Sequence, residues 1–302
     1  ALRVRRVSSF LSETRRMQKL MPKSFIQLKK ASFLGGFFVV VFLVLTSCTT
    51  DKADGKMVFR YNEPAGIPSL DPAFAKEKSS IWVVQQLYEG LVALDSENAI
   101  VPALALEWEI DSTAKVYTFR LRNASFHNGK PLAADDVVYS LNRLRDPKVA
   151  SPGSWVVEDI ASLRTVDAST VEIVLKQPNS TFLSLLAMPF CSVVPKDEIT
   201  LTKSPVGTGP FKFHVWHYGE KLVLHKNETY WRIDGNGAQL PYLDGISISF
   251  LTDQQSAFLE YLRGNFDFLP NLDPSFKDDL LTKQGALQER YAAEHTLMRS
   301  PF

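Results

Sequence analysis

The sequence predicts a mixed α/β fold (α+β), because segments with two kinds of hydrophobic periodicity follow one another along the chain. Residues 116–122 alternate between apolar and polar side chains, as in a half-buried strand. Residues 134–145 instead carry their apolar side chains at helical spacing. Since strands and helices alternate without a strict strand–helix–strand rhythm, a mixed architecture is favoured over a regular parallel one.

The first elements are expected between residues 57 and 91. Residues 57–61 are a short strand candidate, and the prolines at positions 64, 68 and 72 then exclude a helix. A helix is predicted from Ser79, and Gly90 near its end can supply a left-handed stop. Four apolar side chains define this helix by their spacing: Ile81, Val84, Tyr88 and Leu91.

A strand, a turn and a second helix are predicted next. In the strand, Tyr117, Phe119 and Leu121 share one face. A tight turn is predicted at Asn128-Gly129, and the helix over 134–145 follows it. Asp135 and Asp136 lie in the first turn of this helix, where the helix dipole favours anions. The apolar stripe of the helix consists of Val137, Val138, Leu141 and Leu144.

The remaining strands are expected at residues 171–175, 222–226 and 246–250, with a turn-rich stretch at 234–237. A last helix is predicted after Thr252 and Gln255, which have the spacing of a capping box, and Gly264 lies just past its end.

The N-terminal part of the sequence is typical of an export signal. Residues 23–30 are basic, residues 33–45 are apolar, and a polar stretch follows. Because a transmembrane helix needs about 20 apolar residues, a cleaved signal is favoured over a permanent span. The residues ahead of the signal begin with Ala1 rather than Met, so we interpret them as upstream or vector sequence and leave them out of the predicted fold.

Cys48 follows Leu45-Thr46-Ser47, and this order resembles the lipobox of bacterial lipoproteins. In those proteins the cysteine thiol is acylated, and the cysteine becomes the new N-terminus after cleavage. The alternative is that Cys48 is an ordinary small residue at the end of a membrane anchor or of a plain secretory signal. Residues 49–56 are polar and fit a tether.

Cleavage before Cys48 would remove nine of the 34 Lys/Arg and one of the 33 Asp/Glu, which leaves a net charge of about −7. Such a surface favours solubility and argues against nucleic-acid binding. If Cys48 is acylated, Cys191 is the only other cysteine and no internal disulfide can form. A packed core must therefore provide the stability of this chain.

No pattern in the sequence favours catalysis, a cofactor or a metal site. His214 and His217 have a spacing that places them on opposite faces of a strand, which is wrong for chelation. The stretch 207–210 reads as a tight turn entering a strand rather than a phosphate loop, because the Lys-Ser/Thr signature is missing and Pro210 lacks an amide hydrogen. Asp135 and Asp136 are helix-start residues, since adjacent helical positions do not face each other.

A series of short motifs, each weak by itself, occurs in a specific order between residues 57 and 270. They are Ser69-Leu70-Asp71-Pro72, Gln86-Leu87-Tyr88-Glu89-Gly90-Leu91, Pro102-Ala103-Leu104-Ala105, Tyr117-Thr118-Phe119-Arg120-Leu121-Arg122, Phe126-His127-Asn128-Gly129-Lys130-Pro131, Asp136-Val137-Val138-Tyr139-Ser140, Val206-Gly207-Thr208-Gly209-Pro210-Phe211, Asn227, Tyr230-Trp231 and Arg263-Gly264. This ordered series resembles the family 5 extracellular solute-binding proteins, which are the dipeptide, oligopeptide and nickel receptors of ABC importers.

The resemblance implies a two-lobed clamp of the type II periplasmic-binding-protein kind, which closes about a hinge on a ligand in the cleft. It also implies that the chain is a fragment that lacks most of the second lobe, including the acidic residue that usually grips a peptide's α-amino group. The implied division is a leader at 1–47, a tether at 48–56, a first lobe at 57–95 and 191–268 with an inserted subdomain at 96–190, and the crossing into the second lobe at 269–302.

Three segments match the ligand-facing parts of the family. They consist of Lys76, Glu77, Lys78 and Ser79, of Gly153, Ser154 and Trp155, and of Leu269, Pro270 and Asn271. Gly153 stands where oligopeptide binders often have an aromatic residue, so that contact is open. For Trp155 packing within the subdomain is an equal alternative, and for the charges at 76–78 a solvated loop is the simpler interpretation.

The resulting expectation is a binding protein without chemistry of its own, which delivers peptides to the permease subunits of an ABC importer. We expect it to be exported, held at the cell membrane by a lipid on Cys48, and monomeric at full length. A carrier of another solute, such as a metal chelate or an oligosaccharide, is the alternative within the family. An exported lipoprotein peptidase is the alternative outside it.

Overall fold

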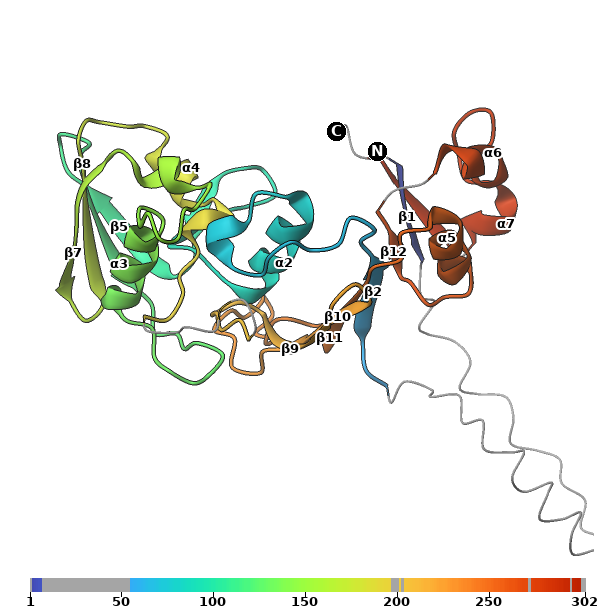
Figure 1. Ribbon diagram of the computed structural model, residues 1–302, viewed down its shortest axis with the longest axis horizontal. Helices are drawn as coiled ribbons and strands as arrows, with labels where there is room; N and C mark the ends of the chain where they lie inside the picture. Colours follow the sequence, from blue (N-terminus) through green and yellow to red (C-terminus); the bar gives the residue numbers. More distant parts are fainter. Residues whose placement is uncertain are drawn as a thin grey trace, which may run out of the picture.

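The computed structural model describes residues 2–6, 55–196, 201, 204–270, 273–293 and 295–299. Its architecture is the mixed α/β fold that the sequence predicts, with one large sheet, one four-stranded sheet and short helices around them (Figure 1). Cys48 and nearly all of the tether lie outside the described residues.

The large sheet has the strand order β13-β1-β12-β2-β11-β10-β9. β2 runs parallel to β11 and β12, whereas all other neighbours in this sheet are antiparallel. The bounds of its strands are β1 Leu2–Arg6, β2 Val58–Asn62, β9 Phe211–His217, β10 Lys221–Lys226, β11 Gly245–Ser249, β12 Phe268–Leu269 and β13 His295–Arg299.

The four-stranded sheet is antiparallel and has the order β5-β6-β8-β7. Figure 1 places it at the opposite end of the molecule from α5, α6 and α7. A separate pair, β3 with β4, leads into it. The bounds are β3 Val92–Leu94, β4 Ile100–Pro102, β5 Ala105–Ile110, β6 Val116–Leu121, β7 Ile160–Asp167 and β8 Thr170–Leu175.

Six helices and four short 3-10 turns accompany these sheets in the part of the chain that the structure describes. The helices are α2 Lys78–Leu87, α3 Ala134–Arg143, α4 Phe182–Leu186, α5 Gln254–Leu262, α6 Lys277–Leu280 and α7 Glu289–Ala292. The 3-10 turns are η1 Pro72–Phe74, η2 Ser154–Val157, η3 Pro189–Cys191 and η4 Pro274–Phe276. None of the helices in these described ranges combines the length and apolarity that a membrane span needs.

Buried side chains form three clusters. One fills the four-stranded sheet and its helices around Phe119, Phe126 and Phe182. A second lies between α2 and the strands β2, β9, β10 and β11, and a third joins α5 to β12 and α6. Each cluster provides apolar burial of its own. The division into a first lobe with an inserted subdomain and a crossing segment stays a prediction.

The stretch ahead of the signal contradicts our expectation, because Leu2–Arg6 forms a strand of the large sheet. This strand, β1, pairs antiparallel with β12 on one side and β13 on the other. Its sequence alternates between Leu or Val and Arg, as a strand requires. The facing edges of β12 and β13 offer backbone donors and acceptors that a strand between them satisfies.

Two predicted helix signals are also wrong in detail. α2 ends at Leu87 with Tyr88 in an extended conformation, and Gly90 lies beyond the helix without a positive φ. Gly90 is instead packed closely, since a Cβ there would lie 3.2 Å from the carbonyl oxygen of Leu186. At α5 the N-cap is Asp253, whose carboxylate accepts from the Ser256 amide at 2.7 Å, rather than the expected Thr252. Asp competes well for such a position because its carboxylate reaches the first-turn amides.

Candidate ligand-binding site

The first expected ligand segment leaves a buried turn and runs into α2. Asp71 caps η1 by accepting from the Ala73 amide at 3.0 Å, and the chain then passes through residues 75–77 to α2. Lys76 and Glu77 are exposed and lie 3.9 Å apart as an ion pair. Such exposed pairs contribute little to stability, so both charges are available to a ligand.

Lys78 is exposed as well, but it has an aromatic partner, and Ser79 is buried. The Lys78 ammonium lies 4.5 Å from the centre of the Trp82 ring, which is a cation–π contact. Ser79 is buried in the first turn of α2. The N-cap of this helix, Glu77, makes no side-chain capping bond. First-turn amides of α2 therefore lack a side-chain cap and favour a negative group nearby.

The second expected segment follows Ser151 and contains η2. Gly153 is buried under the Phe190 ring, and a Cβ at this position would lie 2.4 Å from Cγ of that ring. This contact explains why an aromatic residue cannot stand at position 153 in this chain. Ser154 is exposed, and Trp155 is 52% exposed, so about half of the surface of Trp155 remains accessible.

These two segments are brought together although about 75 residues separate them in the sequence. The Ser151 hydroxyl donates to the Ala73 carbonyl at 2.6 Å and accepts from the Gly153 amide at 3.0 Å. The two segments are thus linked through buried groups beside them, and we call residues 75–79 and 153–155 together the wall.

The third expected segment lies apart from the wall. Leu269 is 5% exposed and packs into the cluster of α5 and α6, and Pro270 is buried as well. Asn271 is outside the described residues. Aromatic residues connect this third segment to α2. Phe268 of β12 lies opposite Tyr61 of β2 in the sheet, and the Tyr61 ring centre lies 6.4 Å from that of Trp82 on α2.

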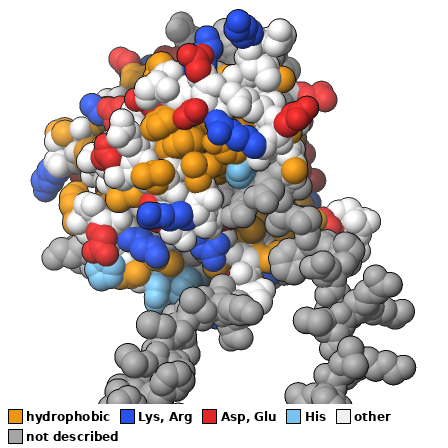
Figure 2. Space-filling model, turned by 90° about the vertical axis from the view of Figure 1, so that its right-hand side faces the viewer, with side chains coloured by type: hydrophobic (Ala, Val, Ile, Leu, Met, Phe, Trp, Pro, Cys, Tyr) orange, Lys and Arg blue, Asp and Glu red, His pale blue; other side chains and the backbone are white. Residues whose placement is uncertain are grey.

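An open groove of about 530 Å³ lies between α2 and the strands β2, β11 and β12. A strand was predicted at 57–61, but no pattern in the sequence predicted this groove. Its lining is mostly aromatic and aliphatic, with two glutamine amides: Phe59, Tyr61, Trp82, Val83, Gln85, Gln86, Phe211, Leu243, Ile246, Ile248 and Phe268. Elsewhere, on the side of the molecule that carries α5 to α7, Figure 2 shows further hydrophobic side chains gathered at the surface among charged ones.

The motif residue Glu89 belongs to the scaffold rather than to the wall. Its carboxylate accepts from the Tyr230 hydroxyl at 2.7 Å and from the indole nitrogen of Trp231 at 2.8 Å. Burial raises the pKa of Glu89, and these two donors act in the opposite direction. The Arg122 guanidinium stacks 3.5 Å from the Trp231 ring centre. Motifs far apart in the sequence thus meet in one polar network.

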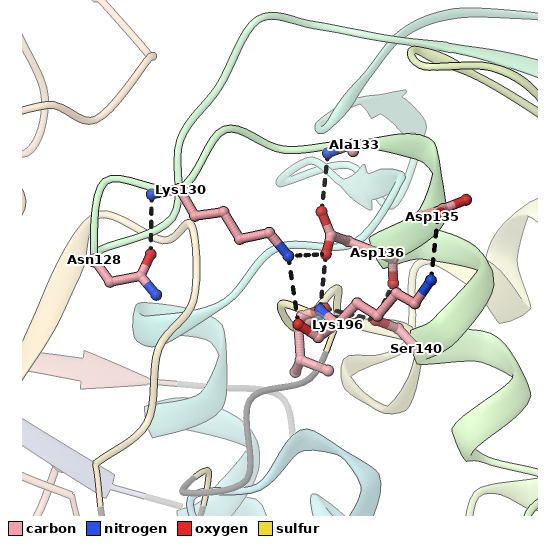
Figure 3. A network of polar contacts seen from close by, with 8 residues as sticks. Asn128, Lys130, Ala133, Asp135, Asp136, Ser140 and Lys196 are labelled. Carbon is pink, nitrogen blue, oxygen red and sulfur yellow. Dashed lines mark hydrogen bonds and ion pairs between the residues drawn. The ribbon is translucent and has the colours of Figure 1, made fainter.

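The two adjacent aspartates at the start of α3 also have structural partners (Figure 3). Asp136 is 1% exposed and accepts from the amides of Ala133 and Lys196 and from the Lys130 ammonium, at 2.7 to 3.0 Å. Asp135 bonds instead to Thr165 and to the Lys196 side chain. The two carboxylates face different partners, as expected of helix-start residues.

The stretch 207–210 is a close-packed turn, which confirms the predicted structural interpretation. The Gly207 amide donates to Nδ1 of His127 at 3.2 Å, and the Gly209 amide donates to the Leu87 carbonyl at 3.0 Å. Because both amides are engaged, they cannot cradle a phosphate. The glycines are needed for close approach, since a Cβ at Gly207 would lie 2.0 Å from the Leu87 carbonyl oxygen.

The histidine geometry does not resemble a metal site. His214 stacks on His225 with ring centres 3.9 Å apart and planes 17° from parallel, so their lone pairs do not converge on one point. Within the described ranges no three or more His, Cys, Asp or Glu side chains are grouped as ligands would be.

Comparison with known proteins agrees with this fold. The family model of the bacterial extracellular solute-binding proteins, family 5, matches residues 99–298. The probable deoxycholate-binding periplasmic protein YgiS of Escherichia coli is 31% identical over 70% of this chain and 43% of its own length. The periplasmic oligopeptide-binding protein OppA of Salmonella typhimurium is 31% identical over 67% of this chain and 43% of its own.

A solved structure leads to the same class. The periplasmic binding protein DppA of Helicobacter pylori, in complex with the peptide STSA, superposes with a TM-score of 0.67 and 29% identity over 74% of this chain and 48% of its own. The fold is that of the periplasmic solute-binding proteins. The chain belongs to the bacterial extracellular solute-binding proteins, family 5, which are binding proteins rather than enzymes. It spans less than half the length of each of these three relatives.

Proposed function

We propose that this chain is part of the solute receptor of an ABC importer, which captures peptides outside the cytoplasmic membrane and delivers them to permease subunits. Family membership over residues 99–298 supports the receptor role. The observation that carries the proposal is the wall, whose two linked segments present exposed charges at 76–78 and an exposed indole at Trp155. The matching name of OppA and the peptide in the DppA structure support a peptide ligand.

The chemistry of the wall suits a short peptide. Lys76 and Lys78 can pair with carboxylates, and Glu77 can pair with an amine. Trp155 and the covered Gly153 leave a flat apolar surface for a side chain, and Ser154 adds a hydroxyl at its margin. We assign Ser79 to the support of this surface because it is buried. Leu269, Pro270 and Asn271 are proposed as the crossing that faces the ligand from the hinge.

A different solute is the second candidate. The aromatic groove beside α2 favours a ligand with apolar rings, and the relative YgiS, a probable deoxycholate-binding protein, supports such ligands within the family. A metal chelate or an oligosaccharide belongs to the same alternative. An exported peptidase has weaker support, because the buried carboxylates of Glu89 and Asp136 are engaged with structural partners.

The location follows from the leader. We propose export, cleavage before Cys48 and anchoring to the cell membrane by a lipid on that cysteine, with the wall facing the periplasm or the cell exterior. Residues 33–48 support this proposal by their order of apolar and small residues. The full-length receptor is proposed to be a monomer.

The test uses the full-length protein and a mixture of isotope-labelled di- to pentapeptides. After incubation and gel filtration, mass spectrometry of the protein fraction is expected to find unchanged peptides. Fragments of the added peptides would indicate a peptidase instead. If no peptide is retained while deoxycholate or a nickel–histidine chelate is, the peptide proposal is wrong and the alternative solute is supported.

A further inference from the structure

The wall is held from behind by one ion pair, which joins the inserted subdomain to the first segment. The guanidinium of Arg143, at the end of α3, makes two hydrogen bonds to the carboxylate of Asp71. The side chains of Arg143 and Asp71 are 15% and 3% exposed. Two parallel bonds fix the relative orientation of two planar groups, which a single contact does not.

Asp71 connects this pair to the backbone of the wall. Besides Arg143, its Oδ1 accepts from the Ala73 amide at 3.0 Å and so orients the turn η1. The carbonyl of Ala73 in turn accepts from Ser151, which also holds Gly153. A short series of bonds therefore runs from Arg143 through η1 to both halves of the wall.

The other end of α3 is fixed independently. There Asp136 accepts from the backbone amide of Lys196, and nearer the Arg143 end the Ser140 hydroxyl accepts from the Val194 amide at 2.9 Å. Figure 3 shows these contacts on one side of α3. α3 is thus bonded to other parts of the chain at both ends, through Asp136 at its start and Arg143 at its end.

We infer that Arg143 and Ser151 are positioning residues, which set the distance between residues 75–79 and 153–155 and hence the shape that a ligand meets. This inference rests on the proposed binding function for its effect on affinity. Its structural part, the coupling of the two halves of the wall, does not depend on which solute binds. Neither side chain needs to touch the ligand for this role.

Arg143→Lys and Ser151→Ala test the inference in the full-length protein. Lysine keeps the charge but cannot make two parallel bonds, and alanine removes the hydroxyl that joins the segments. Arg120→Lys is the matched control, since Arg120 is an exposed arginine paired with Glu107 on the four-stranded sheet. Hydrogen–deuterium exchange without ligand is measured on peptides that cover 72–80 and 150–158.

Both variants are expected to speed exchange at least tenfold in both segments, whereas Arg120→Lys changes neither. Faster exchange confined to 150–158 in Ser151→Ala, or unchanged exchange in either segment in Arg143→Lys, would overturn the inference. If Arg143→Lys does not fold, Ser151→Ala still tests the inference. Ser151 lies in the segment 150–158, so faster exchange at residues 75–79 would show that the two segments are coupled. A merely structural role would lower the melting temperature without this selective cross effect.

Retention of the labelled peptide mixture supplies the functional half of the test. Both variants are expected to bind the retained peptides at least tenfold more weakly than the wild type and the Arg120→Lys control. If both variants exchange faster in both segments but bind the peptides as tightly as the wild type, the positioning role is wrong. If the wild type retains no peptide, the proposed function fails, while the exchange data still decide whether the two segments are coupled.

Discussion

His127 is expected to make the stability of this protein depend on pH between about 4 and 6.5. Its ring bridges the turn at 207–210: Nδ1 accepts from the Gly207 amide at 3.2 Å, and Nε2 lies 3.0 Å from the Gly209 carbonyl oxygen. Since Nδ1 is an acceptor, the neutral ring carries its proton on Nε2 and donates to Gly209. A second proton would have to displace the Gly207 amide.

The direction of the pKa shift of His127 determines whether stability rises or falls with pH. Burial lowers the pKa of His127 to about 4, and the nearby charge of Lys212 acts in the same direction. The unfolded chain has the ordinary value of about 6.5 and therefore binds more protons than the folded one between these limits. The contribution is fully present above pH 6.5 and is lost as the pH falls toward 4.

The magnitude follows from the difference of about 2.5 pKa units at about 1.36 kcal/mol each. The full effect is then about 3 kcal/mol, and about 2 kcal/mol is lost by pH 5. Other groups titrate in the same range, and the raised pKa of Glu89 acts with the opposite sign. A comparison with His127→Gln cancels these shared contributions.

The measurement is urea unfolding of wild type and His127→Gln at pH 7.5, 6, 5 and 4.5. The glutamine variant is expected to be less stable at pH 7.5. The difference between the unfolding free energies of wild type and variant is expected to shrink by about 2 kcal/mol between pH 7.5 and pH 5. Nuclear magnetic resonance of the folded wild type should show no titration of the His127 ring near pH 6.5. A gap that is independent of pH, or a ring that titrates at its ordinary value, would refute the argument.

Four further outcomes are expected. Gly207→Ala and Gly209→Ala should each lower the free energy of unfolding by about 1–3 kcal/mol, because a Cβ meets the end of α2. Unchanged stability would contradict the close packing, and a melting shift with ATP in the wild type would contradict the interpretation of 207–210 as a structural turn. Burial raises the pKa of Cys191 to about 12, so iodoacetamide should label it only after denaturation, and rapid labelling of the native protein would be contrary evidence. Cys48→Ala should leave the membrane fraction or accumulate as precursor; normal processing would speak against the lipoprotein. Residues 48–302 alone should bind peptides several powers of ten more weakly than the full-length protein, as titration calorimetry can measure, since half of the buried partners are gone; equal affinity would contradict the clamp.

Sequence reasoning located the elements whose burial is one-sided. β6 was predicted because Tyr117, Phe119 and Leu121 share a buried face, and the structure leaves none of them more than 6% exposed. β5 was not predicted, although Leu106-Glu107-Trp108-Glu109-Ile110 alternates between apolar and acidic side chains. In the structure β5 is an edge strand, and both Leu106 and Ile110 are exposed. An alternating sequence can therefore mark a strand even where its apolar face is not buried.

The candidate site shows a different limit. The sequence suggested the segments at 76–79 and 153–155 through resemblance, but it gave no sign of the contacts that join them. Asp71 and Arg143 lie 72 residues apart, and Ser151 and Ala73 lie 78 apart. Contacts between residues so far apart leave no local periodicity or spacing in the sequence, so they can be identified only in the folded structure.

The motifs that identify the family and the residues of the wall occupy different physical environments. Glu89, Tyr230 and Trp231 are held in a buried polar network, and a substitution there leaves unpaired groups at a cost of about 1 to 3 kcal/mol each. Lys76 and Trp155 are exposed and have no comparable structural contacts that would fix their identity. The recognisable motifs therefore maintain the scaffold, while the exposed residues of the proposed wall are free to change. We expect substitutions of Lys76 or Trp155 to alter ligand preference at little cost in stability, and a shared family does not imply a shared ligand.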